Sequence, residues 1–199
     1  QYNEVFPLKI TDIRAEARDV LLIELRAASG DKLPPFEPGA HLEINLPNGL
    51  IRHYSLCNDN QERNRYVIGI GRSAQSRGGS LFIHQHLRCG DSLSVHAPKN
   101  NLRLDPQAEQ FFFIAGGIGI TPIRSMIHWC VDNQRPWRLV YATRSRQRAA
   151  FYQELSQYVE QVQLQFDDKS GTVLDVNGVL SDWVEGEQIC VCGADSVLR

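Results

Sequence analysis

The sequence predicts two domains, an antiparallel β-barrel of the Greek-key type followed by a doubly wound α/β domain with a parallel sheet. Short and often alternating apolar runs, separated by Pro- and Gly-rich turns, fill the first half and are typical of a small barrel. In the second half, continuous apolar runs alternate with helical patterns, as expected for a parallel sheet covered on both faces. We therefore expect one domain over residues 1–105 and a second over residues 106–199.

The first half is expected to hold up to six strands and one short helix. The strands are predicted over residues 8–14, 20–27, 41–46, 52–57, 66–71 and 92–97. Turn-forming pairs such as Pro38-Gly39 and Asn48-Gly49 separate them, and residues 79–88 carry a helical pattern.

The second half is expected to alternate strands with helices. Strands are predicted over residues 111–115, 139–142, 162–166 and 188–192, and helices over residues 122–130 and 148–159. The chain stops where a helix after Cys192 would begin, so we expect this domain to be C-terminally truncated.

The composition is that of an ordinary globular protein. The 199 residues are 42% hydrophobic and carry a net charge of −2, which gives nucleic-acid binding little support. No stretch of roughly 18 apolar residues could span a membrane, and the start lacks the regions of a signal peptide, so we expect a cytoplasmic protein. The five cysteines fit neither a zinc pair nor an iron–sulfur spacing and are expected to be reduced thiols.

A glycine-rich stretch, Ala115-Gly116-Gly117-Ile118-Gly119-Ile120-Thr121-Pro122, follows the first strand of the second half and opens a helix. Glycines at such a turn let backbone N–H groups approach a pyrophosphate, with the helix dipole behind them. The spacing is not that of the G-x-G-x-x-G fingerprint, and a tight strand–helix turn without a ligand is the alternative.

Two stretches of the first half also favour anion binding. In Arg52-His53-Tyr54-Ser55-Leu56 an arginine suits a phosphate, a tyrosine ring can lie on an aromatic ligand, and a serine hydroxyl can bond a ring nitrogen. Alternation directs His53 and Ser55 to the side opposite Arg52. An edge strand with a packed tyrosine is the alternative.

The second stretch, Arg77-Gly78-Gly79-Ser80, combines a guanidinium, bare N–H groups and a capping hydroxyl at a predicted helix start. A plain N-cap would explain Ser80 but neither the glycines nor Arg77. Together with the glycine-rich turn, these stretches indicate a protein that holds two nucleotides against each other, as a reductase does when hydride passes from a nicotinamide to a flavin.

The chain resembles the flavin and nicotinamide domains of the ferredoxin–NADP reductase superfamily. More narrowly, it is similar to the phthalate dioxygenase reductase and vanillate O-demethylase reductase group. The resemblance covers nearly the whole chain and rests on blocks in the family's order, at residues 52–59, 76–80, 97–100, 115–122, 141–144, 150–155 and 190–193.

The resemblance implies a flavin in a groove of the barrel, FMN rather than FAD. Arg52 and the stretch Arg77, Gly78, Gly79 and Ser80 would hold its phosphate. Tyr54 would pack on the isoalloxazine and Ser55 would hydrogen-bond near N5. His53, Ile70 and Gly71 complete the expected flavin-contacting set.

The resemblance likewise implies a nicotinamide dinucleotide on the second domain. Gly116, Gly117, Gly119 and Thr121 would line its path, while Cys192 and Gly193 would sit by the nicotinamide. Ser55 and Cys192 would be the catalytic positioning groups. The segment after Tyr141 holds Arg144, Arg146 and Arg148 where acidic residues are often found, and arginines can accommodate a 2′-phosphate, so NADPH stays open. A solvated helix start is the alternative explanation for Arg146 and Arg148, and NADH is expected.

Family members continue into a domain with a 2Fe-2S cluster, which we expect only in a missing C-terminal domain. The implied function is the FMN-dependent reductase component of a multicomponent, Rieske-type oxygenase that degrades aromatic compounds, with a terminal oxygenase component or a ferredoxin as partner. Alternatives are a non-catalytic electron-transfer or nucleotide-sensing subunit, and a carbohydrate or oligonucleotide binder that uses the barrel face.

No metal site is expected in this chain. His84 and His86 lie two residues apart on a predicted helix and cannot easily face one zinc ion together with His96. Cys190 and Cys192 alternate on a buried strand, which favours apolar packing and one site thiol over a redox pair.

Overall fold

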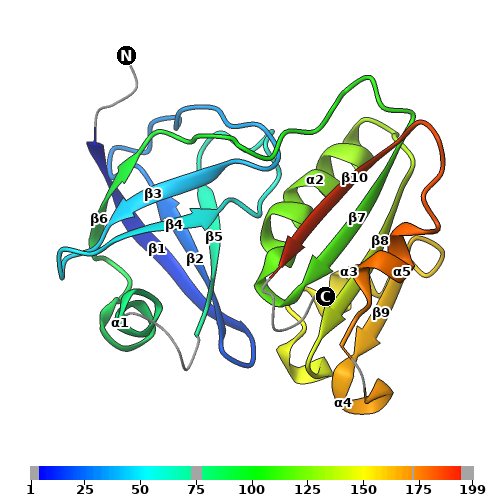
Figure 1. The fold of residues 1–199 in the computed structure, drawn as a ribbon. Coiled ribbons are helices and arrows are strands. Elements are labelled where there is room, and N and C mark those ends of the chain that lie inside the picture. The colour runs from blue at the N-terminus through cyan, green and yellow to red at the C-terminus, as the bar shows by residue number, and fades with distance from the viewer. Residues whose placement is uncertain (1–4, 73–77, 172, 194–199) are drawn as a thin grey trace.

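The computed structural model of the protein describes residues 5–72, 78–171 and 173–193, and it leaves out the side chain of Ser80. Two domains lie side by side (Figure 1). A six-stranded antiparallel sheet forms the first and a four-stranded parallel sheet with helices forms the second. The predicted fold class is confirmed. The boundary predicted between residues 105 and 106 lies in the connection between the two sheets and stays a prediction.

The first domain is a closed antiparallel sheet. Its elements are β1 (Val5–Ala17), β2 (Val20–Arg26), β3 (His41–Asn45), β4 (Ile51–Ser55), β5 (Tyr66–Gly71), α1 (Gly79–His86) and β6 (Ser92–His96). The strand order is β4-β3-β6-β1-β2-β5, and a bridge between Leu56 and Ile68 brings the two outer strands together. Alternate residues fill the interior: in β3, Leu42 and Ile44 are fully buried while Glu43 faces outward.

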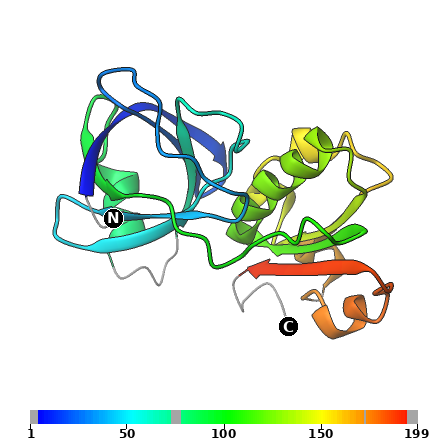
Figure 2. The ribbon, with the colours of Figure 1, turned by 90° about the horizontal axis from the view of Figure 1, so that it is seen from above.

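The second domain is doubly wound. Its elements are β7 (Gln110–Gly116), η1 (Gly117–Gly119), α2 (Ile120–Asp132), β8 (Trp137–Thr143), η2 (Arg146–Arg148), α3 (Tyr152–Leu155), β9 (Val162–Phe166), α4 (Asp167–Ser170), α5 (Val176–Leu180) and β10 (Glu187–Gly193). The parallel strands follow the order β10-β7-β8-β9. Figure 2 shows α2 and α5 on opposite faces of the sheet, with β10 running toward the barrel.

The alternating residues of β7 explain why both faces are covered. Phe111 and Phe113 pack with α2, whereas Phe112 and Ile114 pack with the side of α5. Because both sets are fully buried, the strand reads as one apolar run without alternation.

The helix predicted over residues 148–159 is wrong. The structure has a 3₁₀ turn, an extended Ala149 and the four-residue α3. Phe151 adopts a φ of +62°, in the left-handed region, and its N–H donates to Glu16 Oε1 of the barrel at 3.0 Å. A contact with the other domain therefore overrides the helical pattern in the sequence. The short helices α4 and α5 were not predicted.

Glu24 of β2 ties several barrel segments together. Its carboxylate accepts hydrogen bonds from Arg26 Nε and Arg65 Nη1, both at 2.9 Å, and from Thr11 Oγ1 at 2.8 Å. Partial burial raises the pKa of Glu24, but these hydrogen bonds outweigh that effect and lower the pKa to about 2.

We expect this network to make the protein sensitive to acid. The usual pKa of the carboxyl is 4.5, so its stabilisation is complete above that pH and is lost as the pH falls toward 2. Glu24→Gln should lower the free energy of unfolding at neutral pH by roughly 1–2 kcal/mol, allowing for solvent screening. Urea unfolding at a series of pH values measures this. A difference between wild type and variant that stayed constant down to the acid limit would contradict the assignment.

Candidate cofactor site

The side chain of Arg52 lies over the N-terminus of α1. A Cβ on Gly79 would sit 2.3 Å from Arg52 Nε, so a glycine gives the guanidinium room to approach the helix. Gly78, the N-cap, has a φ of +95°, which favours glycine. A guanidinium beside the first N–H groups of a helix can bind an anion such as a phosphate. Arg77 lies outside the described residues, as does the Ser80 side chain.

Strand β4 carries the other predicted flavin contacts. Tyr54 is half-buried against the barrel core, and Ser55 ends the strand opposite His41. His53 is directed to the outer side of the sheet, where its Nε2 lies 3.6 Å from Glu43 Oε1. Tyr54 therefore lies two residues after Arg52, near the end of β4. The His53 side chain points toward Glu43 on the outer side of the sheet.

Strand β5 lies directly against the glycine-rich turn of the second domain (residues 116–119). A Cβ on Gly69 would sit 2.5 Å from Thr121 Cγ2, and one on Gly71 would sit 3.5 Å from Ile118 Cβ. Ile70, between them, points into the barrel core and is fully buried, so its side chain is not available to a cofactor. Gly71 lies at the contact between the two domains.

The glycine-rich turn rests on the end of β10. A Cβ on Gly119 would sit 2.2 Å from the carbonyl oxygen of Cys192, a contact that only glycine permits. Gly117 has a φ of +54°, and the Thr121 hydroxyl donates to the Ile118 carbonyl at 3.0 Å. Gly119 and Thr121 thus pack inside the turn, whereas the buried Gly116 ends β7 and the partly exposed Gly117 begins the turn.

Cys192 and Gly193 end β10 beside the turn, opposite Ala115 and Gly116 of β7. Burial raises the pKa of the Cys192 thiol to about 11, so the thiol is protonated at neutral pH. A neutral thiol is a weak hydrogen-bond donor and a poor nucleophile. The protonated Cys192 thiol is therefore suited to positioning a ligand rather than to attacking one.

The three arginines after β8 have different surroundings. Arg144 is exposed at the end of the strand. The Arg146 guanidinium lies 4.4 Å from the centre of the Tyr152 ring, and Arg148 Nη1 lies 2.9 Å from Asp19 Oδ2 in the barrel. Arg146 and Arg148 are therefore held by protein groups.

A carboxylate accompanies Arg144 at this edge of the sheet. Asp167 follows β9, the neighbour of β8, and the next residue's N–H donates to the Arg144 carbonyl at 3.0 Å. Among the described residues, Asp167 Oδ1 is buried and yet accepts no hydrogen bond. A hydroxyl group of a ligand bound along the carboxyl ends of the strands could satisfy it.

The histidines bind other protein groups. His84 Nε2 lies 3.1 Å from the Ile70 carbonyl oxygen, and His96 Nε2 lies 2.9 Å from Glu43 Oε2. Within the described ranges, no three His, Cys, Asp or Glu side chains gather to hold a metal ion. Of the helices in the same ranges, none is long and apolar enough to cross a bilayer.

Comparison with known proteins agrees with this geometry. Residues 113–198 match the family of oxidoreductase NAD-binding domains. Phenoxybenzoate dioxygenase subunit beta of Ectopseudomonas oleovorans is 44% identical over 96% of this chain and 60% of its own length. Phthalate dioxygenase reductase of Burkholderia cepacia is 39% identical over 96% of this chain and 61% of its own length.

A solved structure resembles the chain in both fold and sequence. Phthalate dioxygenase reductase, described as a modular structure for electron transfer from pyridine nucleotides to 2Fe-2S, superposes with a TM-score of 0.90 at 38% identity. The match covers 96% of this chain and 61% of that one. The chain is therefore a homologue of the phthalate dioxygenase reductases over nearly its whole length. It spans about three fifths of the length of these relatives.

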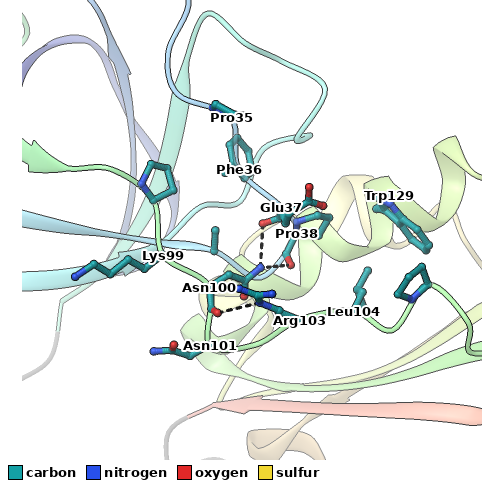
Figure 3. Close-up of a pocket in the computed structure, with 13 residues that line it drawn as sticks. Pro35, Phe36, Glu37, Pro38, Lys99, Asn100, Asn101, Arg103, Leu104 and Trp129 are labelled. Carbon is teal, nitrogen blue, oxygen red and sulfur yellow. Dashed lines mark hydrogen bonds between the residues drawn. The ribbon is translucent and has the colours of Figure 1, made fainter. Parts of the chain in front are cut away.

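A groove of about 790 Å³ also lies between the domains (Figure 3). Its wall combines prolines and the apolar side chains of Phe36, Leu104 and Trp129 with the charged side chains of Glu37, Lys99 and Arg103. Asn100 crosses it and donates to the carbonyls of Pro38, at 3.0 Å, and Glu37. None of the predicted cofactor residues lines this groove, so we do not assign the cofactors to it.

Two features of this region were not predicted from the sequence. Gly69 looks like an ordinary strand residue, and Asp167 lies in a polar run after a strand. Only the Asp167 position carried a signal, because acidic residues that follow a strand of a doubly wound sheet can contact a ribose.

Proposed function

We propose that the protein is the flavin- and nicotinamide-binding part of an oxygenase reductase. It binds FMN in the barrel domain, accepts hydride from NADH bound at the glycine-rich turn, and passes electrons singly to a 2Fe-2S centre. The observation that carries the proposal is the direct contact of β5 with that turn through Gly69 and Gly71. This contact places the barrel sheet beside the turn that would bind the coenzyme.

The residues beside α1 suit FMN. A terminal phosphate needs a dedicated anion site, and Arg52 approaches the helix N-terminus so closely that Gly79 tolerates no side chain without displacing it. Tyr54 follows on the same side of β4 and would cover the flavin ring. Ser55 would orient the ring by a hydrogen bond near N5. FAD, whose phosphates lie inside the molecule, suits a terminal-phosphate site less well.

The protein's contribution is orientation. The bound flavin supplies the redox chemistry, since it can take the two electrons of a hydride and release them one at a time. Gly116 and Gly117 would present N–H groups to the pyrophosphate, and the neutral Cys192 thiol with Gly193 would hold the nicotinamide ring beside Ser55. No side chain of the site has to act as a strong acid or base.

The coenzyme is proposed to be NADH. The unsatisfied Asp167 Oδ1 would accept a hydrogen bond from a ribose hydroxyl, whereas its charge would repel a 2′-phosphate. Arg146 and Arg148 are held by Tyr152 and Asp19, which leaves Arg144 as the arginine that could favour NADPH.

The electron acceptor is proposed to be a 2Fe-2S centre, in a further domain or a separate ferredoxin, that serves the terminal oxygenase component of an aromatic-degrading system. The names of the relatives support this: besides those above, vanillate O-demethylase oxidoreductase of Acinetobacter baylyi is 40% identical over 85% of this chain and 54% of its own length. The proposed location is the cytoplasm.

An anaerobic titration of the FMN-loaded chain tests the proposal. We expect NADH to bleach the visible flavin absorbance, and to do so about tenfold faster than NADPH, the ratio that one unfavourable contact of about 1.4 kcal/mol gives. Faster reduction by NADPH would overturn the coenzyme assignment. A chain that cannot be loaded with FMN or FAD, or whose flavin neither coenzyme bleaches, would overturn the reductase proposal.

A further inference from the structure

Helix α2 carries the glycine-rich turn at its start and also forms the contact between the domains. Its apolar residues, such as Ile123 and Met126, belong to one buried cluster with Val20, Leu22 and Val67 on the outside of the barrel. The helix is therefore packed on both sides, against its own sheet and against the barrel. Apolar packing of this kind holds surfaces together but fixes their register only weakly, since it is non-directional.

Directional contacts come from two neighbouring residues of α2. Arg124 Nη1 donates to the carbonyl of Cys57 at 2.9 Å, and Ser125 Oγ donates to the carbonyl of Asn58 at 2.9 Å. Arg124 and Ser125 follow Thr121 by three and four residues, so the three side chains share one face of the helix. Thr121 contacts Gly69 of the barrel on that same face.

The corner that receives these bonds is itself hydrogen-bonded to β5. The Cys57 N–H donates to the Val67 carbonyl at 2.9 Å, and Asn58 Oδ1 accepts from the Val67 N–H at 3.0 Å. Both residues are fully buried, and Cys57 comes two positions after Ser55 of β4. A displacement of α2 is thus transmitted to the strand with the proposed flavin contacts.

Arg124 is itself fixed in place. Its Nε lies 2.9 Å from Glu154 Oε2, and its guanidinium lies 4.5 Å from the centre of the Phe151 ring. Phe151 in turn donates its N–H to Glu16 of the barrel. Burial raises the pKa of Glu154, but the His128 ring, whose Nε2 lies 3.2 Å from Glu154 Oε1, and the charge of Arg124 outweigh it and lower the pKa, which keeps the carboxylate ionised.

We propose that Arg124 is a positioning residue that sets the register between the glycine-rich turn and β4, and so the approach of the nicotinamide to the flavin. The inference rests on the proposed function. Because hydride transfer falls off steeply when the reacting atoms are misplaced by as little as 1 Å, we expect its loss to slow reduction by roughly 10- to 100-fold.

Arg138 offers a matched control. It lies 2.9 Å from Glu187 Oε1, its guanidinium lies 3.6 Å from the centre of the Phe112 ring, and it donates to the Asp182 carbonyl at 2.9 Å. Arg124 and Arg138 thus each bind a carboxylate, a ring and a carbonyl. Only the carbonyl of Arg124 belongs to the other domain.

The first measurement needs no cofactor. Hydrogen exchange of the FMN-free chain should become faster over residues 56–69 in Arg124→Met, and stay at the wild-type rate there in Arg138→Met. Equal exchange rates over residues 56–69 in both variants would overturn the proposal that Arg124 couples α2 to this part of the barrel. If Arg124→Met does not fold, Ser125→Ala is used instead, with the same expected direction and the same overturning result.

The second measurement is the rate of flavin reduction at saturating NADH in the FMN-loaded chain. Arg124→Met should bind FMN normally and be reduced roughly 10- to 100-fold more slowly, while Arg138→Met keeps the wild-type rate. A wild-type rate in Arg124→Met, or an equal loss in both variants, would overturn the positioning role. A wild-type chain that NADH does not reduce would instead overturn the proposed function, and the exchange experiment would still decide whether Arg124 joins the domains.

Discussion

Gly119→Ala is expected to uncouple the glycine-rich turn from β10 and to nearly abolish flavin reduction by NADH. The new Cβ would lie 2.2 Å from the Cys192 oxygen, 2.4 Å from its carbonyl carbon and 2.6 Å from the Gly193 nitrogen. These are backbone atoms, so either the end of β10 or the turn has to move. We expect a loss of roughly 1–3 kcal/mol in the free energy of unfolding and a reduction rate lower by at least about 100-fold.

The backbone of Gly119 makes the substitution easy to interpret. Its φ of −59° and ψ of −13° are helical, so alanine adds no backbone strain and the loss reports the overlap alone. Gly178→Ala in α5 is the control, because its Cβ would meet only the carboxylate end of Asp175, which can swing away. Urea unfolding and stopped-flow absorbance measure the two effects. A Gly119→Ala protein with normal FMN content and a wild-type reduction rate would refute the assigned contact.

Gly39→Ala is expected to be the most destabilising single substitution considered for this chain. A Cβ there would lie 1.8 Å from the Leu102 carbonyl oxygen and 3.0 Å from Met126 Cε, and φ is +97°. Overlap and left-handed strain add, so we expect a loss of roughly 3–5 kcal/mol. Gly39 lies where a barrel loop, the connection between the domains and α2 meet, so the loss should affect both domains.

Gly49→Ala separates the two contributions to that loss. Its φ is +86°, close to that of Gly39, but nothing lies within 4 Å of the new Cβ. Only the strain remains, and we expect a loss of about 1 kcal/mol. Denaturant unfolding of the two variants side by side gives the difference. Equal losses would show that the tight approach of Leu102 does not govern stability at Gly39.

The sequence was sufficient for the features that depend on local pattern. The six barrel strands, the strand before the glycine-rich turn and the helix after it all appear close to the predicted ranges, because alternation and glycine placement are set by neighbouring residues. That Arg52 and the start of α1 share a ligand was implied by the family resemblance and stays a prediction; the structure places the Arg52 side chain beside Gly79.

Features that depend on contacts between distant residues could not be predicted. The pattern over residues 148–159 is helical, yet Phe151 turns left-handed to reach Glu16, more than a hundred positions earlier. Ile70 belongs to a predicted site strand but points into the barrel, and Arg124 gains its partner from a corner 67 positions away. Nothing in the neighbouring residues encodes the contacts of Phe151 and Arg124, because both depend on how the two domains meet.

The ion pair between Arg148 and Asp19 places a constraint on how this chain could evolve a new coenzyme preference. An arginine that binds a 2′-phosphate must be free to turn toward it, but Arg148 already attaches the second domain to the barrel. A lineage that recruited Arg148 for NADPH would weaken the domain contact across which the proposed hydride transfer would take place. Arg144 is the more accessible alternative, because its side chain could bind a 2′-phosphate without disturbing how the domains are joined.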